Sequence, residues 1–90
     1  MSESYVLKNY MEHFVAETAP KIMESAGICQ CENCQLDVMA IALNSLSPKY
    51  VVTKQGELFT KLNIMQNQFE VDILTALSKA IEVVKQKPRH

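Results

Sequence analysis

The feature that most constrains this chain is a cluster of three cysteines within six residues, Cys29, Cys31 and Cys34, spaced C-x-C-x-x-C. The chain contains no other cysteine. An odd number excludes a complete set of disulfides, and thiols this close together enclose only a short, strained loop whose stabilising effect is small. The segment is therefore expected to be a metal site or a redox site rather than a folding crosslink.

Of these alternatives we favour zinc. Zinc takes thiolate and imidazole ligands in a tetrahedron, and a tight turn can direct sulfurs spaced by one and two residues toward one ion. A thioredoxin-like redox pair needs an acidified thiol, whereas the residues inside this C-x-x-C are Glu32 and Asn33, which do not acidify one. Cys34 is expected at the start of the following helix, where unpaired N–H groups favour a thiolate.

Three thiolates leave the fourth position of a tetrahedral zinc ion to be filled. The candidates are His13, His90, Asp37, a water molecule, or a group from a second copy of the chain. A water molecule would make the zinc catalytic, since catalytic zinc keeps one position for substrate. No glutamate or histidine lies beside the cluster at the spacing of known zinc-hydrolase motifs, so we expect a closed, structural zinc site.

Composition predicts one small helical domain covering residues 1–90. Hydrophobic residues make up 48% of the chain, and only two Gly and three Pro interrupt it, which favours long regular elements and an all-α fold. The net charge of −1 gives no field that would attract nucleic acid or an anionic membrane. No Ser-His-Asp, paired-carboxylate or phosphate-loop constellation is present, so we expect no enzyme activity.

We expect a cytoplasmic location. The first residues lack a basic segment followed by an unbroken apolar stretch, and nowhere do eighteen apolar residues run together, so neither an export signal nor a membrane span is predicted. Clustered free thiols suit a reducing compartment.

The apolar pattern predicts three main helices. A first helix, capped by Ser4, is interrupted at Thr18 and Pro20, and a short helix over 20–25 ends at Gly27. After the cysteines, 35–46 is apolar nearly all round, which indicates a central helix buried on several sides. Residues 49–54 form an extended connector or short strand, followed by a break at Gly56.

Residues 58–85 are predicted to form one long helix. A 28-residue helix spans about 42 Å, longer than one small domain can cover. We therefore expect a two-fold homodimer, the commonest closed oligomer. The apolar stripe that would form the core or the dimer seam consists of Leu62, Met65, Phe69, Ile73, Ala76, Ala80 and Val83.

The segment from residue 29 to 51 reads C-x-C-x-x-C-x-x-D-V-x-A-x-A-L-N-x-L-x-P-x-Y-V. In this pattern, and in its ending Pro88-Arg89-His90, the chain resembles the late competence development protein family ComFB. The resemblance implies a small helical dimer, a zinc site on the cysteine cluster, and a family in which receptors for cyclic dinucleotides such as c-di-GMP or c-di-AMP occur. Some members carry a further cysteine where this chain has His90, which makes His90 the preferred fourth ligand.

A cyclic dinucleotide carries two phosphates and two purines, so its receptor needs cations and flat apolar surfaces. The cations available are Lys49, Lys54, Lys61 and Arg89, and the stacking faces are Tyr50 and Phe59. The alternative for each is ordinary: connector lysines are commonly solvated, and Tyr50 would pack on the central helix. We thus expect a zinc-binding, competence-related regulator that binds a cyclic dinucleotide, or alternatively a ligand-free adaptor that docks onto a protein of the DNA-uptake machinery.

Overall fold

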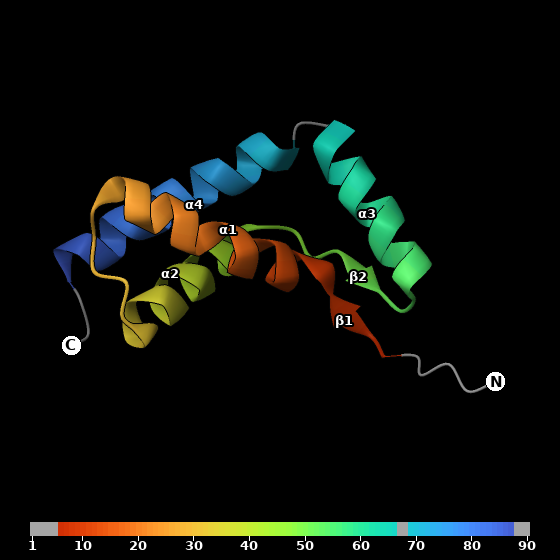
Figure 1. The fold of residues 1–90 in the computed structure, drawn as a ribbon, viewed down its shortest axis with the longest axis horizontal. Coiled ribbons are helices and arrows are strands. Elements are labelled where there is room, and N and C mark those ends of the chain that lie inside the picture. Colours follow the sequence, from red (N-terminus) through yellow and green to blue (C-terminus); the bar gives the residue numbers. More distant parts are fainter. Residues whose placement is uncertain (1–5, 67–68, 88–90) are drawn as a thin grey trace.

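The structure, a computed structural model, describes residues 6–66 and 69–87. Its elements are, in chain order, β1 (Lys8–Asn9), α1 (Tyr10–Ala26), α2 (Glu32–Ser45), β2 (Tyr50–Val51), α3 (Lys54–Gln66) and α4 (Phe69–Gln86). Helices α1, α2 and α4 pack together, whereas α3 stands at one end of the molecule (Figure 1). The strands pair antiparallel, with Lys8 opposite Val51. The mostly helical fold and the extended connector are thereby confirmed.

Helix α1 has well-defined signals at both ends. Asn9 is its N-cap, and the Oδ1 atom accepts a hydrogen bond from the backbone N–H of Met11 at 3.1 Å. At the other end Gly27 adopts a left-handed φ of 72°, and its N–H donates to the carbonyl of Glu24 at 3.1 Å. The predicted stop at Gly27 is confirmed, whereas the predicted cap, Ser4, lies outside the described residues.

The predicted interruption at Thr18 and Pro20 is wrong, because Pro20 lies inside α1. Proline in a helix interior removes one hydrogen bond and costs about 3 kcal/mol. Val15, Ala19 and Met23, which flank it on one face, are each completely buried. Their packing holds the helix together across the proline.

The core lies between α1, α2 and α4, and α2 packs against both of the other helices. Cys34, Val38 and Ala42 are its buried residues, while Leu36 is 53% exposed. Met39, Ile41 and Leu43 are partly buried against the core as well, so the prediction of a helix buried on several sides is confirmed in part. Helix α4 contributes Ile73, Ala76, Leu77, Ala80, Ile81 and Val84 to the core.

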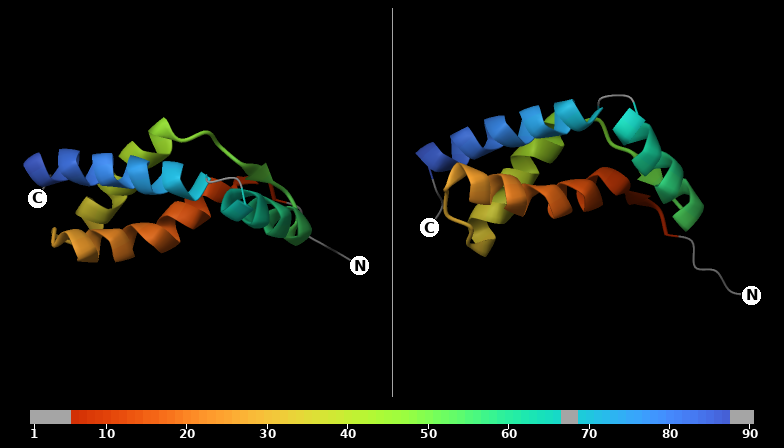
Figure 2. Two further views of the ribbon diagram at one scale, coloured as in Figure 1. Left: turned by 90° about the horizontal axis from the view of Figure 1, so that it is seen from above. Right: turned by 45° about the horizontal axis from the view of Figure 1, so that its top comes forward.

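The predicted helix over 58–85 is two helices, α3 and α4, which lie at an angle to each other (Figure 2). Gly56 does not precede α3 but belongs to its first turn, where its N–H donates to Thr53 Oγ1 at 3.0 Å. The predicted stripe is divided by this change of direction. Leu62 and Met65 are exposed on α3, whereas Ile73 is in the core of the chain.

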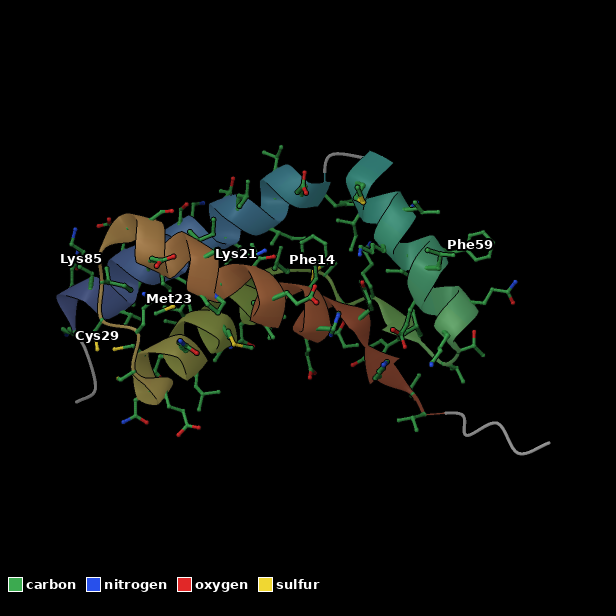
Figure 3. The ribbon with its side chains drawn as sticks, viewed as in Figure 1. Phe14, Lys21, Met23, Cys29, Phe59 and Lys85 are labelled. Carbon is green, nitrogen blue, oxygen red and sulfur yellow. The ribbon has the colours of Figure 1, made fainter. Side chains whose placement is uncertain are left out.

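Helix α3 is attached to the rest of the molecule by few side chains. Among the side chains of α3 that the structure describes, Ile64 is the one that is fully buried. Lys8 Nζ lies 2.7 Å from Glu57 Oε2, and this ion pair connects α3 to β1. Leu58 and Phe59 are more than half exposed, and Phe59 projects away from the bundle (Figure 3). Within the described part of the chain, no helix combines the length and the apolarity needed to cross a bilayer.

Candidate metal centre and ligand pocket

The three cysteines lie where the chain passes from α1 into α2. Gly27 ends α1, Cys29 follows in the connecting loop, and Cys31 is the N-cap of α2 with an extended backbone. Cys34 falls in the first turn of α2, as predicted, and its side chain is 2% exposed. Cys29 and Cys31 are exposed. This segment, residues 29–34, is called the cysteine knuckle below. It has one buried thiol and two thiols that face solvent.

The donor atoms of this knuckle suit one metal ion. All three Sγ atoms lie within 4.8 Å of one another. Zinc–sulfur bonds of about 2.3 Å in a tetrahedron hold sulfurs about 3.8 Å apart. A movement of about 1 Å or less would bring the three sulfurs to that spacing, which flexible side chains on a short loop can make. Three thiols at this separation are a donor set that zinc prefers.

The surroundings shift the pKa values of Cys31 and Cys34 in opposite directions. The backbone N–H of Cys34 donates a hydrogen bond to Cys31 Sγ at 3.5 Å, and this bond lowers the pKa of Cys31. Burial raises the pKa of Cys34 to about 12, with further contributions from Cys31 and Cys29. A metal that binds here would displace the proton of Cys34, because the metal-binding form of cysteine is the thiolate.

The described residues do not supply a fourth ligand. The group of metal-binding side chains that they bring together consists of the three cysteines alone. His13 lies near the other end of α1, about 20 Å along the helix from its last residue, and its Nε2 is 3.3 Å from Glu17 Oε2. Asp37 is not a member of the group either. His90 lies outside the described residues, so its role stays a prediction.

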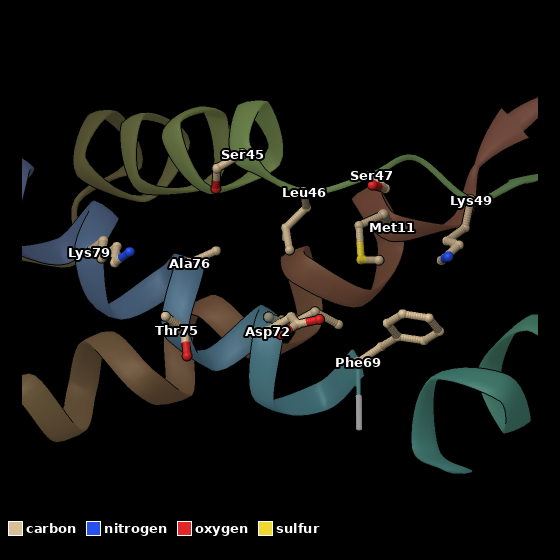
Figure 4. A pocket seen from close by; sticks show the side chains of 11 residues that line it. Met11, Ser45, Leu46, Ser47, Lys49, Phe69, Asp72, Thr75, Ala76 and Lys79 are labelled. Atoms are coloured by element: carbon tan, nitrogen blue, oxygen red, sulfur yellow. The ribbon is translucent and has the colours of Figure 1, made fainter. Parts of the chain in front are cut away.

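A pocket of about 350 Å³ opens at the opposite end of α2, between the connector that follows this helix and the first half of α4 (Figure 4). Lys49 and Phe69 form one end of it, with Lys49 Nζ 4.3 Å from the centroid of the Phe69 ring. Asp72 lies between them and Lys79 at the other end. Two cations, a carboxylate and an aromatic ring therefore line a single cavity.

The backbone of Lys49 is fixed by hydrogen bonds to the start of α1. Asn9 Oδ1 accepts a hydrogen bond from the N–H of Lys49 at 2.7 Å, and the N–H of Tyr10 donates to the carbonyl of Lys49 at 2.6 Å. The same Oδ1 atom caps α1. Asn9 therefore sets the position of the pocket's lysine relative to the bundle.

Of the six residues predicted to bind the ligand, Lys49 alone is found among the described residues that line the pocket, and Phe59 is exposed on α3. Tyr50 is 63% exposed in β2. Lys54 and Lys61 are exposed on α3, and Arg89 lies outside the described residues. Phe69, Asp72 and Lys79 were missed. Their spacing on one helix face is visible in the sequence, but their proximity to Lys49 depends on the tertiary fold.

Comparison with known proteins agrees with this architecture. The family model described as late competence development protein ComFB matches residues 8–88. Competence protein ComFB of Bacillus subtilis (strain 168) is 31% identical over 84 residues, which cover 92% of this chain and 86% of that protein. A solved structure of the late competence protein ComFB from Bacillus subtilis superposes with a TM-score of 0.79 at 29% identity, covering 92% of each chain.

Proposed function

Because the chain belongs to the late competence development protein ComFB family, we propose that it is a non-enzymatic, cytoplasmic regulatory protein that holds a structural zinc ion and binds a cyclic dinucleotide. The observation that carries the zinc assignment is the set of three Sγ atoms within 4.8 Å at the start of α2. Cys29, Cys31 and Cys34 would bind the ion, and His90 is the proposed fourth ligand. The ion would supply folding free energy, as structural zinc does in small domains.

The zinc position has a clear structural use. The knuckle is the link between α1 and α2, and Cys34 belongs to the same buried stripe as Val38. An ion held there would fix the end of α1 against the start of α2. A chain of 90 residues buries only a modest fraction of its surface, so its core supplies limited stability. A metal ion that crosslinks the chain at this position would add to it.

The pocket supports the proposal of a cyclic dinucleotide ligand. Lys49 and Lys79 are cations suited to phosphate, and Phe69 offers a flat face for a purine. The cavity of about 350 Å³ lies at the lower end of the range of about 300–1,000 Å³ found for ligand sites. It suits one nucleotide of the ligand, and a two-fold homodimer would present a second copy of the pocket to the other half.

The exposed apolar surface of α3 supports the proposal of a homodimer. Leu58, Leu62 and Met65 are spaced by four and three residues and therefore share one helix face, and all three are exposed. Val71 and Leu74 of α4 are also exposed. Several large apolar side chains exposed on one helix face are typical of an interface.

Calorimetry with c-di-GMP and c-di-AMP tests the ligand proposal. Lys49→Ala removes a cation from the pocket, and Lys54→Ala, which removes an exposed lysine outside it, is the matched control. We expect Lys49→Ala to weaken binding by about tenfold or more, because a charge-assisted hydrogen bond contributes about 1.5–3 kcal/mol. Lys54→Ala should change affinity little. Equal effects of the two substitutions would contradict the assignment of this pocket.

The second candidate function is a ligand-free adaptor for the competence machinery, and the exposed face of α3 favours it. In that case no cyclic dinucleotide would bind the purified protein at any concentration reached in the calorimeter. Substitutions on α3 would then abolish the association with a protein partner, whereas Lys49→Ala would leave it unchanged.

A further inference from the structure

Cys31 and Cys34 form a pair at the N-terminus of a helix. Cys31 is the N-cap of α2 and Cys34 lies one turn further on, and the N–H of Cys34 donates to Cys31 Sγ at 3.5 Å. The sulfur of Cys31 therefore lies directly in front of the first turn of the helix. Both sulfurs belong to the group in which all Sγ atoms are within 4.8 Å of one another. A disulfide between them requires the two sulfurs to approach to about 2.05 Å.

The two thiols differ in access from solvent. Cys31 is exposed, whereas Cys34 is 2% exposed and packs with the core. A dissolved reagent therefore meets Cys31 before Cys34, and Cys34 is placed to react only with a neighbour inside the knuckle. Cys29 is also exposed, but it is separated from Cys31 by a single residue, so a bond between these two would close a strained loop.

From this arrangement we propose that the metal-free knuckle is a thiol–disulfide exchange site, in which Cys31 attacks a low-molecular-weight disulfide and Cys34 completes the exchange. In the first step the Cys31 thiolate attacks one sulfur of the small disulfide, a mixed disulfide forms, and one small thiolate leaves. In the second step the Cys34 thiolate attacks Cys31 Sγ, the mixed disulfide breaks, and the second small thiolate leaves. The two protein thiols lose two electrons, the small disulfide gains them, and the two released protons are taken up by the two small thiolates.

This inference rests in part on the proposed function, because the same sulfurs are the proposed zinc ligands. A Cys31–Cys34 disulfide leaves Cys29 as the one remaining thiol of the knuckle, which is too few to hold the ion. Zinc and the disulfide are then mutually exclusive. A small disulfide would release zinc from the loaded protein, and bound zinc would slow the exchange.

The sequence allows the bond to be mapped. Glu24 and Glu32 flank Cys29 and Cys31, so cleavage after glutamate separates these two cysteines from Cys34. The full-length protein, freed of metal, is treated with oxidised glutathione, its remaining thiol is alkylated, and the peptides are analysed by mass spectrometry. We expect the two peptides to be joined by a disulfide and the alkyl group to lie on Cys29. An alkyl group on Cys31 or Cys34 would overturn the assignment.

Two matched variants test the role of Cys31. Cys29→Ser should retain the joined peptides, whereas Cys31→Ser should form them about tenfold or more slowly, because the exposed thiol that accepts the N–H of Cys34 is gone. Equal rates for the two variants would overturn the proposal. The reaction is repeated in urea, where the preference for Cys31 over Cys29 should disappear if the folded knuckle produces it.

The zinc-loaded wild-type protein gives an independent readout that does not need a folded metal-free chain. Oxidised glutathione is added with a chromogenic zinc chelator, and zinc release should follow disulfide formation, again with the alkyl group on Cys29. Zinc binding without any Cys31–Cys34 bond in either form would refute the exchange site and leave the metal proposal intact. Disulfide exchange in a chain that binds no zinc would refute the metal proposal and leave the exchange site intact.

Discussion

The ionised carboxylate of Glu57 forms an ion pair with Lys8, and this ion pair links α3 to β1. Lys8 donates a hydrogen bond to the carboxylate at 2.7 Å, and this bond lowers the pKa of Glu57 from its ordinary value of 4.5. A carboxyl whose pKa is lowered by folding stabilises the folded state at pH above the ordinary value and loses this effect as the pH falls through the lowered value. We predict that Glu57→Gln flattens the dependence of unfolding free energy on pH below 4.5.

Chemical denaturation at a series of pH values measures this dependence, and Glu82→Gln, an exposed glutamate on α4, is the control. Glu82→Gln should leave the dependence close to that of the wild-type chain. If the two variants behave alike, Lys8 and Glu57 do not interact in solution.

Single residues also show which parts of the sites could be predicted. The cysteine cluster was predicted as a unit because its members are adjacent in sequence and their chemistry is local. The contact of Lys49 with Phe69 could not be predicted, because it joins residues on two elements through the fold. Asn9 is similar: its hydrogen bond to Lys49 spans 40 positions in the chain.

At the scale of elements, α1 contains a proline in its interior, and the buried residues around it keep the helix continuous. Pro20 cannot donate to the carbonyl of Ala16, and an interior proline costs about 3 kcal/mol, of which about 1 kcal/mol is offset by the stiffer unfolded chain. We predict that Pro20→Ala stabilises the protein by about 1–2 kcal/mol. Urea denaturation measures the change.

Lys21→Ala, an exposed neighbour in the same helix, is the control and should change stability by less than about 0.5 kcal/mol. A Pro20→Ala variant that is less stable than the wild-type chain would mean that the proline ring itself contributes packing that an alanine does not replace.

The long helix predicted over 58–85 shows why element boundaries are difficult to derive from an apolar pattern. The stripe of Leu62, Met65, Phe69 and Ile73 keeps its spacing across the change of direction between α3 and α4. Spacing reports which residues share a helix face, but it does not report whether that face meets the same partner throughout. Here Ile73 meets the core of its own chain, whereas Leu62 remains 43% exposed.

At the scale of the whole molecule, α3 determines how the chain can associate. Apart from the buried Ile64, the large apolar residues of α3 are exposed, and Phe59, which projects away from the bundle, is 68% exposed. If a second copy covers this surface, Phe59→Glu would bury a carboxylate without a partner, which costs several kcal/mol. We predict that Phe59→Glu shifts the protein from dimer to monomer, as measured by its molar mass in static light scattering.

Val83→Glu is the matched control, since Val83 is 54% exposed and lies near the C-terminal end of α4, away from α3. It should leave the dimer mass unchanged. A wild-type chain that is monomeric at all concentrations would contradict the dimer, and a dimer that survives Phe59→Glu but not Val83→Glu would place the interface at the other end of the molecule.

The most direct test of the account is the metal content of the purified chain. The three sulfurs within 4.8 Å predict about one zinc per chain by elemental analysis, and removal of the zinc should lower the free energy of unfolding. Cys31→Ser should lose the metal, whereas Gln30→Ser, which alters the residue between two of the cysteines, should keep it. A wild-type chain that carries no zinc, and does not acquire it when zinc is added to the reduced protein, would contradict the account.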